Sequence, residues 1–135
     1  TNDLTNYYCQ LPAQNIETAF WLESDRMLSL AFSKKSLDVQ RKVVCEEFKE
    51  HYINKPYGNV WHLMRGLAYT THPYKWMTIG QELSHVENAT LEDVKAFFFK
   101  HYRPINAVLV VAGNVKTEQI KQLAAKWFGP IPMGE

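Results

Sequence analysis

The sequence has 135 residues, of which 46% are hydrophobic and 13% are aromatic, and this composition is typical of one globular domain rather than a disordered segment. Fifteen Lys and Arg residues against fourteen Asp and Glu residues give a net charge of +1. The basic residues are scattered, which argues against a nucleic-acid partner. The longest apolar runs, such as residues 107–112, are far shorter than the roughly 20 residues of a membrane-spanning helix, so we expect no membrane span.

The two cysteines, Cys9 and Cys45, stand far apart in the sequence. They could form one disulfide, but isolated cysteines more often pack as buried thiols. We favour two thiols, and the redox compartment stays open.

The chain opens with residues 1–11, a stretch rich in the β-branched and aromatic residues that favour a strand. It has no polar lead-in, which suggests a piece cut from a longer protein. After Pro12, residues 13–30 show helical spacing of core positions. The positions of this stripe are Ile16, Ala19, Phe20, Glu23, Met27 and Leu30.

A second helix is predicted from Ser36, a good N-cap, to about Tyr52. Several prolines and glycines interrupt the following stretch, for which we predict only a short helix at residues 60–67 and irregular structure up to residue 88. Thr90 and Asp93 then form a capping-box pattern. They predict a helix that ends at Arg103-Pro104 and places an aromatic stripe in the core, made of Val94, Phe97, Phe98 and His101.

The continuous apolar run at residues 107–112 predicts a central strand that is buried on both faces. A last helix, capped by Thr117 and stopped by Gly129-Pro130, carries an apolar stripe of Ile120, Leu123, Ala124 and Trp127. This order of elements predicts an α+β fold in which helices pack on one mixed or antiparallel sheet.

One carboxylate of the second helix, that of Glu47, falls on a stripe with Gln40, Val44 and His51 and is predicted to point toward the core. A buried carboxylate without a partner costs several kcal/mol. Glu47 must therefore be exposed after all, paired with a base, protonated or bound to a metal. Glu46 and Glu47 could equally form surface ion pairs.

Other catalytic signatures are missing from the sequence. The five histidines show neither the H-E-x-x-H nor the H-x-x-E-H spacing of zinc helices. No Gly-x-Ser-x-Gly motif surrounds a serine, and no Gly-x-Gly phosphate loop is present. The spacing alone therefore gives no self-contained zinc site, nucleophile or nucleotide site.

Six ordered blocks of the chain resemble a known family. They are Asp3-x-Thr5-Asn6-Tyr7-Tyr8, Leu22-Glu23-x-Asp25-Arg26-Met27, Arg41-x-Val43-Val44-x-Glu46-Glu47, His72-Pro73-Tyr74 with Ile79-Gly80, Lys100-His101-Tyr102-Arg103-Pro104, and Asn106-Ala107-Val108-Leu109-Val110-Val111-Ala112-Gly113-Asn114-Val115 before Phe128-Gly129. This order resembles the inverzincin zinc peptidases, the family of pitrilysin, insulin-degrading enzyme and mitochondrial processing peptidase.

The resemblance implies a metal site that this chain only completes. In the family, two histidines of an H-x-x-E-H motif and a glutamate on a later helix hold zinc, and the motif's own glutamate is the general base. The third ligand corresponds to Glu47. The motif itself would precede Thr1, so residues 1–135 are expected to be one partial domain from the N-terminal catalytic half of a longer peptidase, inactive and without bound zinc when alone.

Gln40 departs from the family pattern, because many active members have a glutamate there that supports the metal site without touching the metal. Such changes typically cost about 10- to 100-fold in metal affinity or activity. The resemblance thus implies peptide-bond hydrolysis by zinc-activated water in the parent protein. Gln40 keeps open a non-catalytic subunit that acts as a binding or structural partner, and a plain α+β domain with a solvated Glu47 is a third possibility.

The resemblance also implies partners and a location. The partners would be a peptide or protein substrate and the remaining peptidase domain or a homologous subunit, and the location would be the bacterial periplasm or cell envelope. An exposed apolar surface is expected where the missing strand and the H-x-x-E-H helix would pack.

Overall fold

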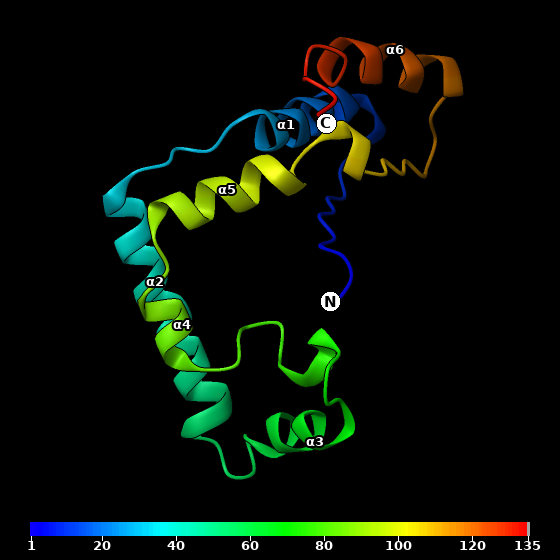
Figure 1. Cartoon of the computed structure of the whole chain (residues 1–135). Coiled ribbons are helices and arrows are strands. Elements are labelled where there is room, and N and C mark those ends of the chain that lie inside the picture. The colour runs from blue at the N-terminus through cyan, green and yellow to red at the C-terminus, as the bar shows by residue number, and fades with distance from the viewer. Residues whose placement is uncertain (135) are drawn as a thin grey trace. The chain divides into compact units, whose positions relative to one another are not determined.

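The computed structural model describes residues 1–134, which form helices joined by extended and irregular segments (Figure 1). The α-helices are α1 (Ile16–Leu28), α2 (Lys34–Phe48), α3 (Val60–Ala68), α4 (Leu83–Glu87), α5 (Leu91–His101) and α6 (Thr117–Trp127). A π-helical turn, Lys49–Ile53, continues α2, and 3-10 turns cover Ala13–Asn15, Pro73–Lys75 and Pro104–Asn106.

The chain divides into two compact units, and each is described by itself below. The first unit contains Thr1–Asn6 and Phe32–Asp93, and therefore α2, α3 and α4. The second contains Tyr7–Ala31 and the residues from Val94 onward, and therefore α1, most of α5 and α6.

The predicted α+β fold with a sheet is wrong for the described residues, which contain no strand and only an isolated bridge between Met77 and Gly80. A strand needs a neighbour about 4.8 Å away to complete its hydrogen bonds. Residues 7–11 and 107–112 lie outside any helix as expected, but no backbone hydrogen bond joins them. Their composition therefore predicts the absence of helix correctly but not the pairing that would make a sheet.

In the first unit, α2 packs against α4, and Arg41 on α2 fixes this contact. Its guanidinium donates hydrogen bonds to the backbone oxygens of Glu87, at 2.9 Å, and Ala89, at 3.2 Å. Glu87 is the last residue of α4, where a helix leaves carbonyl acceptors without intrahelical partners, and Ala89 lies just beyond the C-cap. Cys45 and Phe48 form the buried face of α2, and the Phe48 ring lies 5.4 Å from Tyr52, between ring centroids.

In the second unit, α1 packs against α6. Phe20 on α1 is only 3% exposed and meets Phe128 edge-on, with ring centroids 6.1 Å apart. Phe98 on α5 is also 3% exposed and stacks on Tyr102 at 4.8 Å. The Tyr102 hydroxyl shares a hydrogen bond with the Tyr7 hydroxyl. The pKa of Tyr102 is raised to about 12. The main cause is the burial of its hydroxyl, and the second cause is the hydrogen bond with Tyr7.

The helix starts were predicted with mixed success. Thr90 and Asp93 form the predicted capping box: the Thr90 backbone N–H donates to Asp93 Oδ2 at 2.9 Å, and the Asp93 N–H donates to Thr90 Oγ1 at 3.2 Å. The second helix begins three residues earlier than predicted, because Ser33 and not Ser36 is its N-cap. Thr117 is not a cap either, since it is the first residue of α6.

The predictions of thiols and of no membrane span can also be compared with the structure. Both cysteines are free, with Cys45 buried and Cys9 exposed, so the disulfide alternative and the expected burial of Cys9 are wrong. Among the described helices, none combines the length and apolar character that a membrane span requires.

The aromatic stripe of α5 provides a test of this packing. Phe98 is 3% exposed whereas its neighbour Phe97 is 60% exposed, so only part of the predicted stripe is core. Phe98→Ala should lower the free energy of unfolding by about 3 kcal/mol or more, because it opens a cavity. Phe97→Ala, the matched control, should lower it by less than about 1 kcal/mol. Urea denaturation measures both, and equal losses would contradict the assigned face of α5.

Candidate functional site

Glu47 lies in the last turn of α2, and its side chain is exposed. The buried residues of this helix end are Cys45 and Phe48. Cys45 and Phe48 are three residues apart and therefore lie on one face of α2. Because successive residues are rotated by about 100° around the helix axis, the side chain of Glu47 points away from this buried face. The prediction that Glu47 points toward the core is therefore wrong in the described structure. Gln40, two turns earlier on the same stripe, is exposed as well.

The two neighbouring glutamates differ in their partners. Glu46 accepts a hydrogen bond from Lys49 Nζ at 2.8 Å and forms a surface ion pair with it. The carboxylate of Glu47 has no hydrogen bond or ion pair with any described residue. Of the alternatives considered for Glu47, the structure shows the first, in which the carboxylate is exposed to solvent. The surface ion pair is formed by Glu46 and not by Glu47.

His51 follows Glu47 by four residues, which is about one helical turn. Its Nδ1 lies 2.9 Å from the backbone oxygen of Glu47. Since a carbonyl oxygen only accepts, Nδ1 carries the proton in this bond, and Nε2 of the neutral ring is left as an acceptor. The end of α2 therefore presents a carboxylate and an imidazole nitrogen to solvent.

These groups do not make a metal site by themselves. A zinc site normally takes three or four protein ligands, and the described part of the chain contains no cluster of three His, Cys, Asp or Glu side chains that could hold a metal. Glu47 can therefore supply one ligand to a site whose other ligands come from elsewhere.

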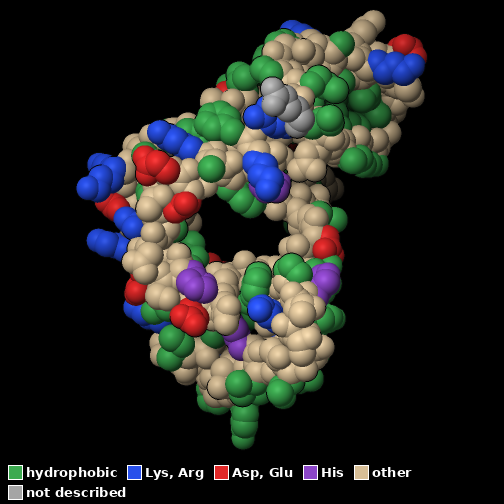
Figure 2. All heavy atoms as spheres, in the orientation of Figure 1, with side chains coloured by type: hydrophobic (Ala, Val, Ile, Leu, Met, Phe, Trp, Pro, Cys, Tyr) green, Lys and Arg blue, Asp and Glu red, His purple; other side chains and the backbone are tan. Residues whose placement is uncertain are grey.

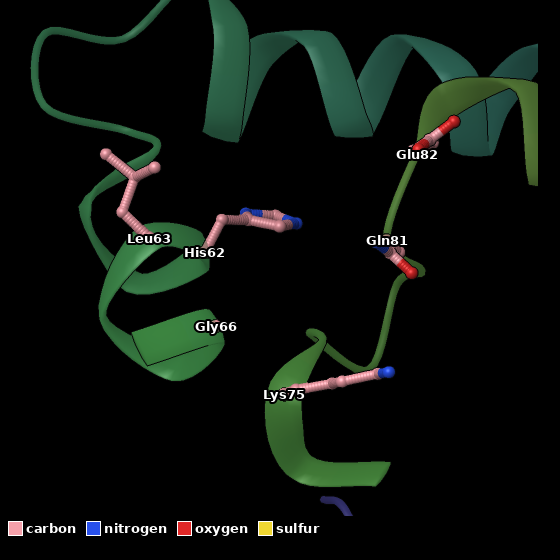
Figure 3. A pocket seen from close by; sticks show the side chains of 6 residues that line it. All are labelled: His62, Leu63, Gly66, Lys75, Gln81 and Glu82. Atoms are coloured by element: carbon pink, nitrogen blue, oxygen red, sulfur yellow. The ribbon is translucent and has the colours of Figure 1, made fainter. Parts of the chain in front are cut away.

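A cavity of about 410 Å³ lies in the same unit, between α3 and the segment that leads to α4 (Figure 3). Its lining residues are His62, Leu63, Gly66, Lys75, Gln81 and Glu82. Figure 3 shows the His62 ring directed into the space between the two walls. His62 Nε2 lies 3.3 Å from the Gly80 backbone oxygen, and its ring packs 4.8 Å from Tyr52.

The walls of this cavity combine positive and negative groups. Lys75 and Glu82 both line it, and the Lys75 ammonium lies 5.2 Å from the Trp76 ring centroid. At Gly66, an added Cβ would meet nothing within 4 Å. The sequence did not predict this cavity, because its residues come from a stretch that reads as a short helix followed by irregular structure.

Comparison with known proteins finds similarity to one family of peptidases. Residues 88–135 match the family described as the peptidase M16 inactive domain. The chain is 32% identical to the zinc protease PqqE of Helicobacter pylori, over 93% of this chain and 28% of that protein. The chain is thus similar over most of its length to the pitrilysin-like peptidases of family M16. The predicted resemblance is confirmed.

Other relatives in the family are subunits of larger assemblies by name. The chain is 26% identical to the mitochondrial-processing peptidase subunit beta of Saccharomyces cerevisiae, over 97% of this chain and 28% of that protein. It is 24% identical to the human cytochrome b-c1 complex subunit 1, over 98% of this chain and 27% of that protein. The chain thus spans less than a third of the length of these relatives.

A solved structure has the same arrangement of elements. The crystal structure of a protease from Helicobacter pylori superimposes with a TM-score of 0.85 at 30% sequence identity. The superposition covers 90% of this chain and 29% of that one. The helical arrangement described above is therefore shared with a corresponding part of a longer protease.

The unequal partners of Glu46 and Glu47 lead to a test. The hydrogen bond from Lys49 to Glu46, and then the charge of Glu46, raise the pKa of Lys49. Glu46→Gln should therefore lower the pKa of the Lys49 ammonium, whereas Glu47→Gln should leave it nearly unchanged. Proton-carbon NMR of the lysine ε-methylene group during a pH titration measures both. A larger effect of Glu47→Gln would contradict the assignment of the ion pair.

Proposed function

We propose that this chain is part of a zinc-dependent peptidase and that Glu47 is one of its zinc ligands. The observation that carries the proposal is the exposed carboxylate of Glu47, which has no partner among the described residues. The resemblance implies that Glu47 corresponds to the family's third zinc ligand. Glu46 beside it is already paired with Lys49. Of the two carboxylates, only Glu47 is left to bind a cation without breaking an existing pair.

The electrostatics of α2 favour a cation at this place. The carboxyl end of a helix carries partial negative charge. Glu46 and Glu47 lie in the last turn of α2, which contains no basic residue itself, and Lys49 in the turn that follows is paired with Glu46 and not with Glu47. A divalent cation would offset both the helix dipole and the carboxylate charge. Cys45 and Phe48, buried on the opposite side, would hold the helix that positions the ligand.

The remaining ligands would come from an H-x-x-E-H motif that this sequence does not contain. When bound, zinc lowers the pKa of its water to about 7 and polarises the scissile carbonyl. The contribution of this chain would be a carboxylate oxygen at a fixed position, with the neutral amide of Gln40 two turns away from it. For the whole protein, the resemblance implies hydrolysis of peptide bonds in a peptide or protein substrate. It also implies a location in the bacterial periplasm or cell envelope.

Gln40 favours a second candidate function, that of a non-catalytic subunit. Gln40 is neutral and exposed, and it stands where a glutamate supports the metal site in many active members of the family. The family match of residues 88–135 is to a domain described as inactive, and one relative is named as a subunit of the cytochrome b-c1 complex. In this alternative the chain would bind or shape a partner and hold no zinc.

Either candidate requires that other protein covers part of the surface, because residues 107–112 are extended and apolar, and all of them except Val111 are exposed. Val108 is 90% exposed and Val110 is 80% exposed. Within the described residues 1–134, no backbone hydrogen bond involves residues 108–112. Figure 2 shows further hydrophobic side chains at the surface of the unit that carries α6. Unpaired β-branched segments of this kind readily pair with another strand. We propose that the remaining peptidase domain or a homologous subunit provides the strand that pairs with residues 107–112.

The ligand role of Glu47 can be measured through metal content. In a longer protein that carries this chain and the upstream residues, elemental analysis should find about one zinc per chain. Glu47→Gln should lose the metal, because an amide replaces a charged ligand. Glu46→Gln is the matched control and should keep it. Retention of zinc in Glu47→Gln would rule out the ligand role.

The same samples separate the two candidate functions. An absence of zinc in all three proteins would exclude the peptidase and favour the non-catalytic subunit. If zinc is bound, Gln40→Glu should raise its affinity by about tenfold or more, in line with other groups that support metal ligands. An unchanged affinity would show that Gln40 does not influence the site.

Hydrogen exchange tests whether another strand pairs with the exposed segment at residues 107–112. The amides of residues 108–112 should exchange within seconds in the isolated chain, because none of them donates a backbone hydrogen bond to another described residue. In the longer protein they should be strongly protected by strand pairing. Mass spectrometry of peptides from this segment measures both states, with peptides from α6 as the control. Equally fast exchange in the longer protein would exclude a strand partner.

A further inference from the structure

A second, smaller depression lies in the unit that contains α1 and α6. Its volume is about 340 Å³, and it is lined by Glu17, Thr18 and Trp21 from α1 and by Trp127 from α6. Trp21 is 50% exposed, so a large indole surface remains open to solvent. Two tryptophans beside one carboxylate combine the two groups that bind organic cations best.

One ammonium group of the chain already occupies this place. Lys126 Nζ donates a hydrogen bond to Glu17 Oε1 at 2.6 Å and lies 5.0 Å from the Trp127 ring centroid. Trp127 Nε1 donates to the same oxygen at 3.1 Å. The bonds from Lys126 and Trp127 lower the pKa of Glu17, so the carboxylate stays charged at neutral pH.

Lys126 is nevertheless held loosely. The side chains of Lys126 and Glu17 are 61% and 50% exposed, and exposed ion pairs shift an equilibrium by only about 1.5- to 5-fold. Another ammonium can therefore exchange with Lys126 on Glu17. Lys126 also indicates the chemistry of the incoming group, because its ammonium fits between the Glu17 carboxylate and the Trp127 ring. A lysine side chain presents the same point donor on the same alkyl stem.

We propose that this depression binds the ammonium group of a lysine side chain from a partner peptide, which replaces Lys126 on Glu17 and lays its alkyl stem against Trp21. The proposal is independent of the zinc role of Glu47, because Glu17, Trp21, Lys126 and Trp127 all belong to the other unit. The surface would select partners by an exposed lysine.

The test uses n-butylammonium as the probe for the lysine side chain. The protein, as this chain or a longer chain that carries it, is labelled with 5-fluorotryptophan at its four tryptophans. Fluorine NMR then follows Trp21 and Trp127, each assigned by a Trp→Phe variant. The expected result is a saturable shift of both resonances with n-butylammonium chloride, and none with n-butanol or with sodium chloride at equal ionic strength.

Variants identify the residues responsible. Lys126→Gln removes the internal competitor and should lower the half-saturating concentration by about two- to fivefold. Lys121→Gln is the matched control on α6. Lys121 Nζ pairs with Glu118 Oε1 at a distance of 3.0 Å, and neither residue lines the depression. This variant should leave the titration unchanged. Glu17→Gln should abolish saturation. Equal shifts with butanol, or no tighter binding in Lys126→Gln than in Lys121→Gln, would overturn the proposal.

Discussion

The burial of a few aromatic rings between helices is the constraint on which both units depend. In one unit, Phe48 is 6% exposed and lies among the rings of Tyr52 and His62. In the other, Phe20 and Phe98 are each 3% exposed. Each unit thus has a small core, and such a core contributes stability mainly through the apolar area that it removes from water. The rotation of each helix about its axis is set by these rings.

This constraint determines the place of Glu47. Once Cys45 and Phe48 face inward, Glu47 must lie on the other side of α2, where its carboxylate is solvated and costs no desolvation energy. A carboxylate in that state is also available to a cation from outside the chain. The exposure of Glu47 therefore removes one physical argument for a metal, the need to neutralise a buried charge, and supplies another, the absence of a competing partner.

Local sequence signals predicted most of the helices. Thr90 and Asp93 define the start of α5 because the two residues bond each other's backbone N–H groups. The stripe through Phe20 predicted the buried face of α1 for a different reason, which is that residues three and four positions apart lie on the same face of a helix. The five residues of α4 are too few for a periodic pattern, which is why the sequence did not predict that helix.

Features that depend on distant residues could not be predicted. Residues 107–112 have a strand composition, but a strand exists only with a partner, and the sequence does not specify one. The facing of Glu47 was predicted wrongly because a stripe through Gln40 and Val44 lies at the edge of the buried face, where periodicity does not distinguish inside from outside. The contact between Glu17 and Trp127 joins residues 110 positions apart and leaves no local trace.

The position of Glu47 relative to a bound zinc ion is the most direct test of the central claim. Crystals of a longer protein that carries this chain and its upstream residues, measured at the zinc absorption edge, locate the ion from its anomalous signal. The account predicts a Glu47 carboxylate oxygen at about 2.0–2.2 Å from the zinc. A zinc ion held entirely by other residues, with the Glu47 carboxylate still in solvent, would contradict it.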